Sequence, residues 1–112
     1  MIIIQSLKEH EQELIKNLTT DGWKAKAEEL EYKDELYCVR AKKKSFFIFN
    51  RVHIYVLLKE VTEDNIEELV DLIKDNFFNY HAIWLAADYF SDEVKDFAQD
   101  TQQIGLLQIN VK

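Results

Sequence analysis

One group of residues in the chain has the types needed for metal-dependent cleavage of a phosphodiester. Asp34 and Glu35 stand just before one predicted strand, and Lys59 stands at the end of another. Such cleavage needs two or more carboxylates to hold a divalent ion, and a lysine to orient the attacking water or to steady negative charge. If the two strands are antiparallel neighbours, Asp34 and Lys59 come together. The alternative is that Asp34 and Glu35 form a turn and that Lys59 is an exposed strand end.

A second feature is a basic segment in an otherwise acidic chain. The formal net charge is −7, which disfavours binding of nucleic acid over a broad surface. Between residues 36 and 59, however, there is no acidic residue. Such a stripe can contact phosphate, an acidic partner or a second copy of the chain, and the alternative is a solvated hairpin turn. The candidate binding residues are Arg40, Lys42, Lys43, Lys44 and Arg51.

Other kinds of site find little support in the residues. The histidines, His10, His53 and His81, are far apart in the sequence and have no cysteine partner, so we expect no metal site. The single cysteine, Cys38, lies in a predicted strand and is expected to be a small buried side chain. The two glycines stand apart, which excludes a glycine-rich loop that cradles phosphate.

Length and composition indicate one folded domain spanning residues 1–112. The chain is 47% apolar and 31% charged, as in ordinary folded proteins. No apolar run approaches the roughly 20 residues that cross a bilayer, and the first residues lack the basic start of a secretory signal. One cysteine cannot form a disulfide within the chain, so we expect a cytoplasmic protein without membrane contact.

Three helices are predicted from capping residues and from apolar residues at helical spacing. Ser6 and Glu9 have the spacing of a capping box for the first helix, which ends before Gly22. Thr62 is the expected cap of the second helix and Ser91 that of the third. The apolar stripes are Leu7, Leu14, Ile15 and Leu18 in the first helix; Ile66, Leu69, Val70, Ile73 and Phe77 in the second; and Val94, Phe97 and Ala98 in the third.

The first half of the chain also predicts strands. Residues 23–27 alternate between apolar and charged side chains, which is typical of a half-buried strand. Residues 36–41 and 51–61 are rich in Val, Ile and Tyr and predict two more strands. The apolar residues 46–49 lengthen one of these strands or form a short one of their own, and residues 1–4 are a candidate edge strand.

The second half adds two strands and suggests the fold class. Residues 82–86 are apolar on both faces, as expected of an inner strand, and Gly105 opens a last strand with alternating apolar residues. Strands separated by helices pair in parallel across crossovers, while the early strands pair as hairpins. The predicted fold is a single three-layer α/β domain with a central mixed β-sheet flanked by helices, in the order α-β-β-β-α-β-α-β.

The order and the endings of these elements carry a family resemblance. A short helix ends in Gly22 and Trp23, a strand hairpin finishes at residues 55–59, and a helix follows. A buried strand then leads through residues 90–98 to residues 104–107. Over nearly the whole chain this pattern resembles the restriction-endonuclease-like, or PD-(D/E)XK nuclease, superfamily. The resemblance implies the corresponding fold.

The resemblance also has consequences for the site. In that family an Asp on one strand and a Glu-x-Lys on the next bind the metal ion and activate water. The resemblance implies that Asp34 matches the first acid and Lys59 the lysine. Leu57 stands at the position of the glutamate, and leucine cannot ligate magnesium. The resemblance therefore implies a nuclease-like fold with a degenerate active site.

Three functions stay open from the sequence. We favour a non-catalytic binding module of nuclease-like fold that needs no cofactor. The second is a magnesium-dependent nuclease in which Glu28, Glu29 or Glu31 supplies the missing carboxylate. The third is a homo-oligomeric protein whose basic segment docks on an acidic face of another copy. The expected partners are a second copy or an acidic protein surface, and the segment 40–51 offers a site for nucleic acid.

Overall fold

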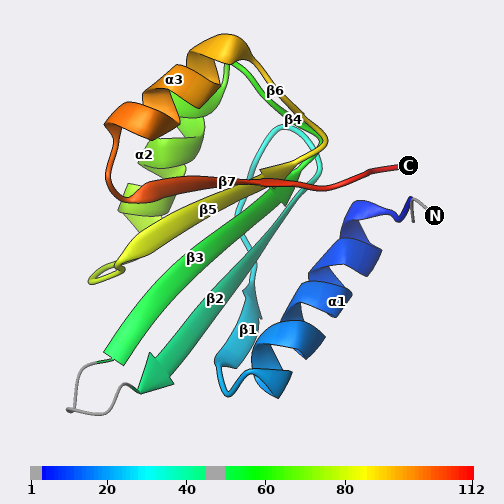
Figure 1. The fold of residues 1–112 in the computed structure, drawn as a ribbon, viewed down its shortest axis with the longest axis vertical. Helices are drawn as coiled ribbons and strands as arrows, with labels where there is room; N and C mark the ends of the chain where they lie inside the picture. Colours follow the sequence, from blue (N-terminus) through cyan, green and yellow to red (C-terminus); the bar gives the residue numbers. More distant parts are fainter. Residues whose placement is uncertain (1–3, 45–49) are drawn as a thin grey trace.

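A mixed five-stranded β-sheet and three helices form the described part of the chain, residues 4–44 and 50–112 of this computed structural model (Figure 1). The strands of the sheet are β1 (Lys24–Glu28), β2 (Leu36–Lys44), β3 (Asn50–Leu58), β5 (Ala82–Ala87) and β7 (Ile104–Gln108). The helices are α1 (Leu7–Thr20), α2 (Ile66–Asn76) and α3 (Asp92–Asp100). Two further strands, β4 (Glu60–Val61) and β6 (Tyr89–Phe90), pair with each other outside this sheet.

The strands follow the order β1-β2-β3-β5-β7 across the sheet. β1, β2 and β3 pair antiparallel as a meander, whereas β5 pairs parallel with both β3 and β7. A helix joins each parallel pair, because parallel neighbours need a long crossover connection. These pairings confirm a single mixed-sheet α/β domain with residues 82–86 in an inner strand. The order predicted from the sequence lacked β4 and β6.

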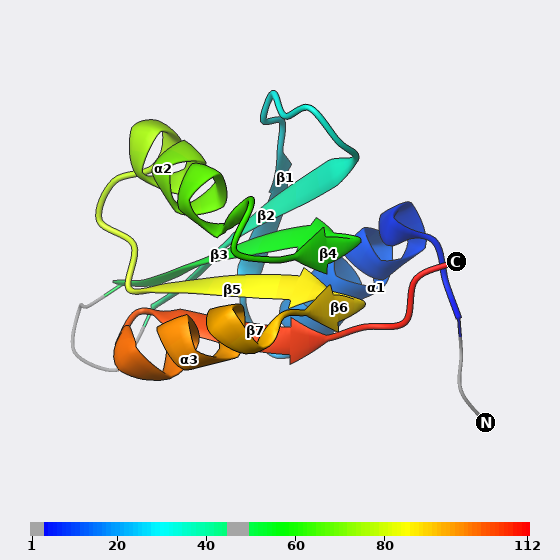
Figure 2. The ribbon, with the colours of Figure 1, turned by 90° about the horizontal axis from the view of Figure 1, so that it is seen from above.

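The helices cover the two faces of the sheet in different places (Figure 2). α1 packs on one face, called here the α1 face, against β1, β2 and β3. α2 and α3 pack on the opposite face, the α2/α3 face, where their apolar residues join those of β3, β5 and β7 in the larger core. Alternation along β3 sends Leu57 to the α1 face and Val56 and Leu58 to the other.

The starts of α1 and α3 agree with the predicted caps. The hydroxyl of Ser6 accepts the N–H of Glu9, and the Glu9 carboxylate accepts the N–H of Ser6, so the capping box is confirmed. At the start of α3 the Ser91 hydroxyl accepts the N–H of Val94. Each bond satisfies a backbone donor that has no partner inside the helix.

The prediction that Thr62 caps α2 is wrong. Its hydroxyl accepts the N–H of Asp64, and the side-chain oxygen of Asn65 accepts the N–H of Thr62. These bonds hold residues 62–65 in a turn, and α2 begins only at Ile66. Threonine and asparagine side chains compete with a helix for backbone groups in this way, which explains the later start.

The predicted strand 51–61 is interrupted at Lys59. The carbonyl of Lys59 accepts the N–H groups of Asp88 and Tyr89, at 3.0 and 3.3 Å. The chain therefore leaves the main sheet after Leu58, and β4 pairs with β6 instead. At the other end of the hairpin, β2 runs further than predicted, to Lys44.

Three further predictions concern residues 46–49, the edge strand at residues 1–4, and Phe97. Residues 46–49 lie outside the described residues, as do residues 1–3 of the predicted edge strand. Phe97, predicted in the apolar stripe of α3, is 38% exposed, because Val94 and Ala98 carry the contact of this short helix with the core. None of the helices among the described residues has the length and apolar character needed to cross a bilayer.

Candidate functional site

The basic segment that the sequence predicted as one site is divided between the two faces of the sheet. Side chains alternate along β2, so Arg40, Lys42 and Lys44 share the α2/α3 face with buried Cys38. Lys43 lies on the α1 face, and its partner across the hairpin is Arg51. The structure therefore brings together only part of the predicted set.

Lys43 makes contacts that are structural. Its ammonium group donates to the carbonyl of Asp21 at 2.9 Å and lies 5.6 Å from the centroid of the Trp23 ring. Between them Gly22 has a φ of 90°, a left-handed conformation that glycine adopts without strain. Lys43 thus ties the end of β2 to the turn between α1 and β1.

Two lysines that the sequence reasoning missed complete a cluster on the α2/α3 face. Lys24 of β1 stands directly opposite Lys42, and Lys26 stands directly opposite Arg40. Directly opposed residues of antiparallel strands share a face. We call the four residues of these two pairs, Lys24, Lys26, Arg40 and Lys42, the basic face; Lys44, beyond them on β2, stands opposite Asn50. In the sequence Lys24 and Lys26 stand at strand spacing, but only the β1–β2 register shows that they lie beside Arg40 and Lys42.

The basic face has no carboxylate partner among the described residues. The three ion pairs found there, Lys33–Glu68, Lys95–Asp92 and Lys112–Glu9, involve none of its members. Like charges directly opposite each other on neighbouring strands destabilise a sheet. Glu28 lies on the same face of β1, two residues beyond Lys26, but it forms no ion pair with these cations. The two opposed pairs are therefore expected to cost some stability.

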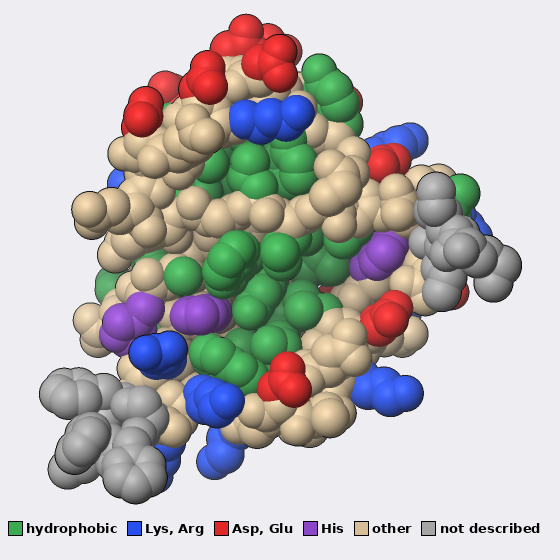
Figure 3. Space-filling model, viewed as in Figure 1, with side chains coloured by type: hydrophobic (Ala, Val, Ile, Leu, Met, Phe, Trp, Pro, Cys, Tyr) green, Lys and Arg blue, Asp and Glu red, His purple; other side chains and the backbone are tan. Residues whose placement is uncertain are grey.

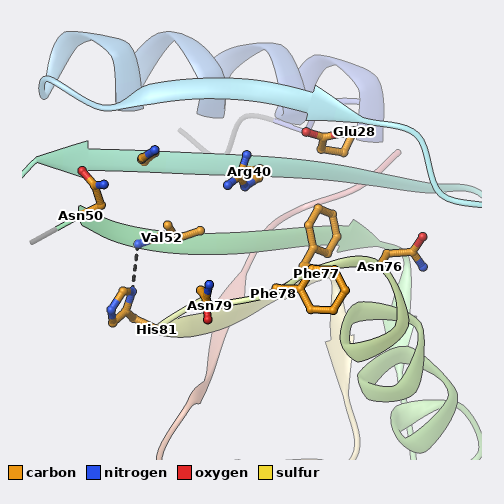
Figure 4. Close-up of a pocket in the computed structure, with 10 residues that line it drawn as sticks. Glu28, Arg40, Asn50, Val52, Asn76, Phe77, Phe78, Asn79 and His81 are labelled. Atoms are coloured by element: carbon orange, nitrogen blue, oxygen red, sulfur yellow. Dashed lines mark hydrogen bonds between the residues drawn. The ribbon is translucent and has the colours of Figure 1, made fainter.

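A pocket of about 540 Å³ opens beside the basic face. Arg40 and Lys42 line it from β2, while Phe77 and Phe78 line it from the connection between α2 and β5 (Figure 4). Phe77 is half-buried against the core, but the side chain of Phe78 is 81% exposed. The polar residues that complete the lining are Glu28, Asn50, Asn76, Asn79 and His81.

His81 fixes one side of this pocket to the sheet. Its ring Nδ1 accepts the N–H of Val52 at 3.1 Å, and its own backbone N–H donates to the carbonyl of Val52 at 2.8 Å. With Nδ1 as the acceptor, the neutral ring carries its proton on Nε2. The second nitrogen is thus a donor for a ligand. Asn79, two residues before His81, has a φ of 57°, which asparagine tolerates better than most residues.

Asp34 and Lys59 meet at a second, smaller pocket. They line a cavity of about 260 Å³ together with Glu35 and Glu60. The antiparallel pairing of β2 with β3 produces this convergence, because Leu36 stands opposite Leu58. Nevertheless, no group of three or more potential metal ligands with suitable geometry occurs among the described residues.

The glutamates considered as replacements for the missing carboxylate lie elsewhere. Glu28 lines the pocket beside the basic face, and Glu28, Glu29 and Glu31 line another cavity, next to α1. None of the three lines the cavity that contains Asp34 and Lys59. In this arrangement they do not complete a metal site with those two residues.

Cys38 and His53 both have environments that shift the pKa of the side chain. Cys38 is fully buried as predicted, and burial raises the pKa of its thiol to about 12. His53 lies on the α1 face between Trp23 and Trp84, with its ring centroid 4.8 Å from that of Trp23. Desolvation lowers the pKa of His53, and the nearby His81 and Arg51 lower it further.

The sheet register thus gives two candidate sites at opposite ends of β3, one basic and one acidic. The pocket beside the basic face, called here the basic pocket, has cations that can hold an anion. The cavity of Asp34 and Lys59, called here the acidic pocket, has a lysine and carboxylates without a metal-binding arrangement. Comparison of the chain with protein-family models, with curated proteins and with solved structures gives no match.

Proposed function

We propose that the protein is a non-catalytic binding module that holds a polyanionic ligand on its basic face. The observation that carries this proposal is the direct opposition of Lys24 to Lys42 and of Lys26 to Arg40, without an acidic partner among the described residues. A ligand with several negative charges offsets the repulsion of these pairs. Without a ligand, this repulsion is expected to lower the free energy of unfolding.

The distribution of charge over the whole molecule supports a confined binding site. Figure 3 shows the α1 face, where acidic side chains gather over α3, at the opposite end of the molecule from basic side chains near the β2–β3 connection. The basic face lies on the other side of the sheet. With a net charge of −7, most of the surface repels a polyanion. The ligand is therefore expected to contact only the few cations of the basic face.

The binding proposal can be tested with inorganic polyphosphate and two matched double variants. Lys24→Glu with Lys42→Glu reverses two charges on the basic face, and Lys16→Glu with Lys95→Glu changes the net charge by the same amount elsewhere. Titration calorimetry should show a loss of about ten-fold or more in affinity for the first variant only. For this variant, the slope of log affinity against log salt concentration should decrease by about one unit for each lost contact. No binding by the parent, or equal losses in both variants, would refute the proposal.

The fold and the acidic pocket support a second candidate, a member of the restriction-endonuclease-like superfamily with residual cleavage activity. Its support is the element order and the shared cavity of Asp34 and Lys59. Leu57 and the lack of a metal-ligand group among the described residues favour the non-catalytic form. We expect no cleavage of DNA or RNA with magnesium or manganese. Metal-dependent cleavage that disappears in both Asp34→Asn and Lys59→Ala would establish the nuclease instead.

Self-association is a third candidate, and the same charge separation favours it. A basic end and an acidic α3 on one molecule allow two copies to meet with opposite charges in contact (Figure 3). Light scattering across a salt series measures this directly. A mass above that of one chain at low salt that falls to one chain at high salt would support association, and a constant mass of one chain would exclude it.

A further inference from the structure

We propose that the polyanion is a single-stranded nucleic acid, with phosphates along the basic face and one base stacked on Phe78. This inference rests on the proposed function and names the class of ligand for the same site. It follows from three features that lie side by side: the linear arrangement of the cations, the exposed aromatic ring and the hydrogen-bonding groups of the pocket.

The cations form two short rows and not a single cluster. Lys24 and Lys26 are two residues apart along β1, and Arg40 and Lys42 are two residues apart along β2. Residues at this spacing are separated by about 7 Å along a strand, and the rows are about 5 Å apart. A row of charges matches a linear polyanion whose successive phosphates are similarly spaced. A compact ion such as free phosphate would use only part of it.

Phe78 provides a flat apolar surface at the edge of the same pocket. It is the most exposed large apolar side chain among the described residues, at 81%. The backbone on either side is fixed, because Phe77 packs against the core and His81 is bonded to Val52. An exposed ring on an anchored loop beside cations is an arrangement on which proteins stack single-stranded bases.

The remaining lining of the pocket can recognise the edge of a stacked base. Asn50 and Asn79 each carry both a donor and an acceptor, and the Nε2 of His81 is a donor when Nδ1 accepts from Val52. Asn76 contributes less, because its amide nitrogen donates to the carbonyl of Leu72 at 2.8 Å. Figure 4 shows these residues around the opening between β2 and the α2–β5 connection. An inorganic polyanion would make no use of this mixture of amides and an aromatic ring.

The dimensions and the charge favour a single strand over a duplex. A volume of about 540 Å³ fits one nucleotide unit and not a double helix. In a duplex the faces of the bases are covered by their neighbours, so none can stack on Phe78. The strongly acidic remainder of the protein also opposes the close approach of a broad duplex surface.

The test uses a fluorescent twelve-residue oligo(dT), the duplex of the same length and polyphosphate as a competitor. Anisotropy should show tighter binding of the single strand than of the duplex. Phe78→Ala should weaken oligo(dT) binding by about ten-fold, the usual loss of one stacked base. The affinity for polyphosphate should not change. Phe97→Ala is the matched control, because Phe97 is also exposed but belongs to α3.

The outcomes separate this inference from the proposed function. If Phe78→Ala binds oligo(dT) as the parent does, or if the duplex binds as tightly as the single strand, the nucleic-acid inference is wrong. Polyphosphate binding that is sensitive to Lys24 and Lys42 would then still stand. If polyphosphate also fails to bind, both proposals are wrong. Circular dichroism of each variant verifies that the fold is retained, as expected for exposed side chains.

Discussion

The helices cover different strands on the two faces of the sheet, so each face is open over strands that are covered on the other. On the α2/α3 face the helices cover β3, β5 and β7, and the open part over β1 and β2 carries the basic face. On the α1 face the helix covers β1, β2 and β3, and the open part over β5 and β7 carries Trp84 and Leu107, which are half-buried.

The two open parts of the sheet differ in the kind of side chain that they carry. The open part of the α1 face is apolar (Figure 3). Its own side chains partly cover it, since the ring of Trp84 lies against Gly105. The open part of the α2/α3 face is charged and has no partner within the described chain. Covered regions thus hold the fold together, while the basic face leaves its lysines exposed on the sheet.

The largest effect is expected from a charge in the covered part of the α2/α3 face. Leu85 lies in the inner strand β5 and is fully buried among residues of α2 and α3. Leu85→Asp would bury an unpaired carboxylate, and the cost of about 4 kcal/mol or more is enough to prevent folding. Leu85→Met, which conserves volume, should lose less than about 1.5 kcal/mol. Thermal melting of both variants by circular dichroism measures this, and a cooperative melt of Leu85→Asp near that of the parent would show that β5 is not central.

A smaller effect is expected in the open part of the α1 face. A Cβ at Gly105 would overlap the six-membered ring of Trp84. Gly105→Ala should therefore lower the free energy of unfolding by about 1–3 kcal/mol, the usual cost of overpacking. In a Trp84→Leu background the same substitution should cost much less, because the ring is gone. Urea denaturation of the parent, the two single variants and the double variant measures this double-mutant cycle. Equal losses of stability in both backgrounds would show that Trp84 is not the obstacle.

These faces also show which parts of the fold were predictable from the sequence. Strand periodicity and hairpin pairing gave the mixed sheet, and Ser6 and Ser91 gave two helix starts, because these signals are local. The start of α2 was not predictable from Thr62, because its hydroxyl is used in a turn that Asn65 completes. Local capping rules do not decide between a turn and a helix when both use the same side chains.

The candidate sites were predictable only in part, for a reason of register. The convergence of Asp34 and Lys59 followed from antiparallel pairing and occurs in the structure. The sequence predicts the basic segment as one site, but alternation sends Lys43 to the other face. The true neighbours of the segment, Lys24 and Lys26, belong to β1 and are joined to it only by the β1–β2 register. Phe78 comes from a loop whose position depends on the packed core.

A pH effect should distinguish the α1 face from the basic face. Desolvation lowers the pKa of His53 below its ordinary value of 6.5, and its Nδ1 is 3.4 Å from the Trp84 indole nitrogen, which donates to it. The unfolded chain therefore binds more protons than the folded chain just below pH 6.5, so stability falls as the pH falls through that range. Urea denaturation between pH 7 and about 5.5, above the usual carboxyl range, measures the slope.

The control for this pH effect is His53→Gln, which removes the titrating ring. The parent should lose stability over this range, whereas the variant should show a flatter dependence. Affinity for polyphosphate at constant salt, corrected for the folded fraction, should not depend on this substitution, because His53 lies on the opposite face from Lys24 and Lys42. An equal pH slope in parent and variant would assign the effect to another group.

The smallest expected effect is also the sharpest test of the basic face, because stability and binding should change in opposite directions. Lys24→Glu places a carboxylate opposite Lys42 and replaces a repulsive pair with an attractive one. The free energy of unfolding should rise by about 0.2–1 kcal/mol, the usual range for a cross-strand pair. Affinity for polyphosphate should fall, because one of four cations is lost and a like charge is added.

Adding Lys42→Glu to Lys24→Glu should remove the attraction between these two positions. With Lys24→Glu and Lys42→Glu together, two carboxylates stand opposite each other, so the gain in stability should disappear while binding weakens further. Lys16→Glu on exposed α1 is the control, since no cation stands opposite Lys16 in a strand and neither measurement should change much. Urea denaturation and calorimetry on the same four proteins measure both quantities. If Lys24→Glu lowers stability, the opposed lysines are not repelling each other, and the main physical reason for a ligand on this face is removed.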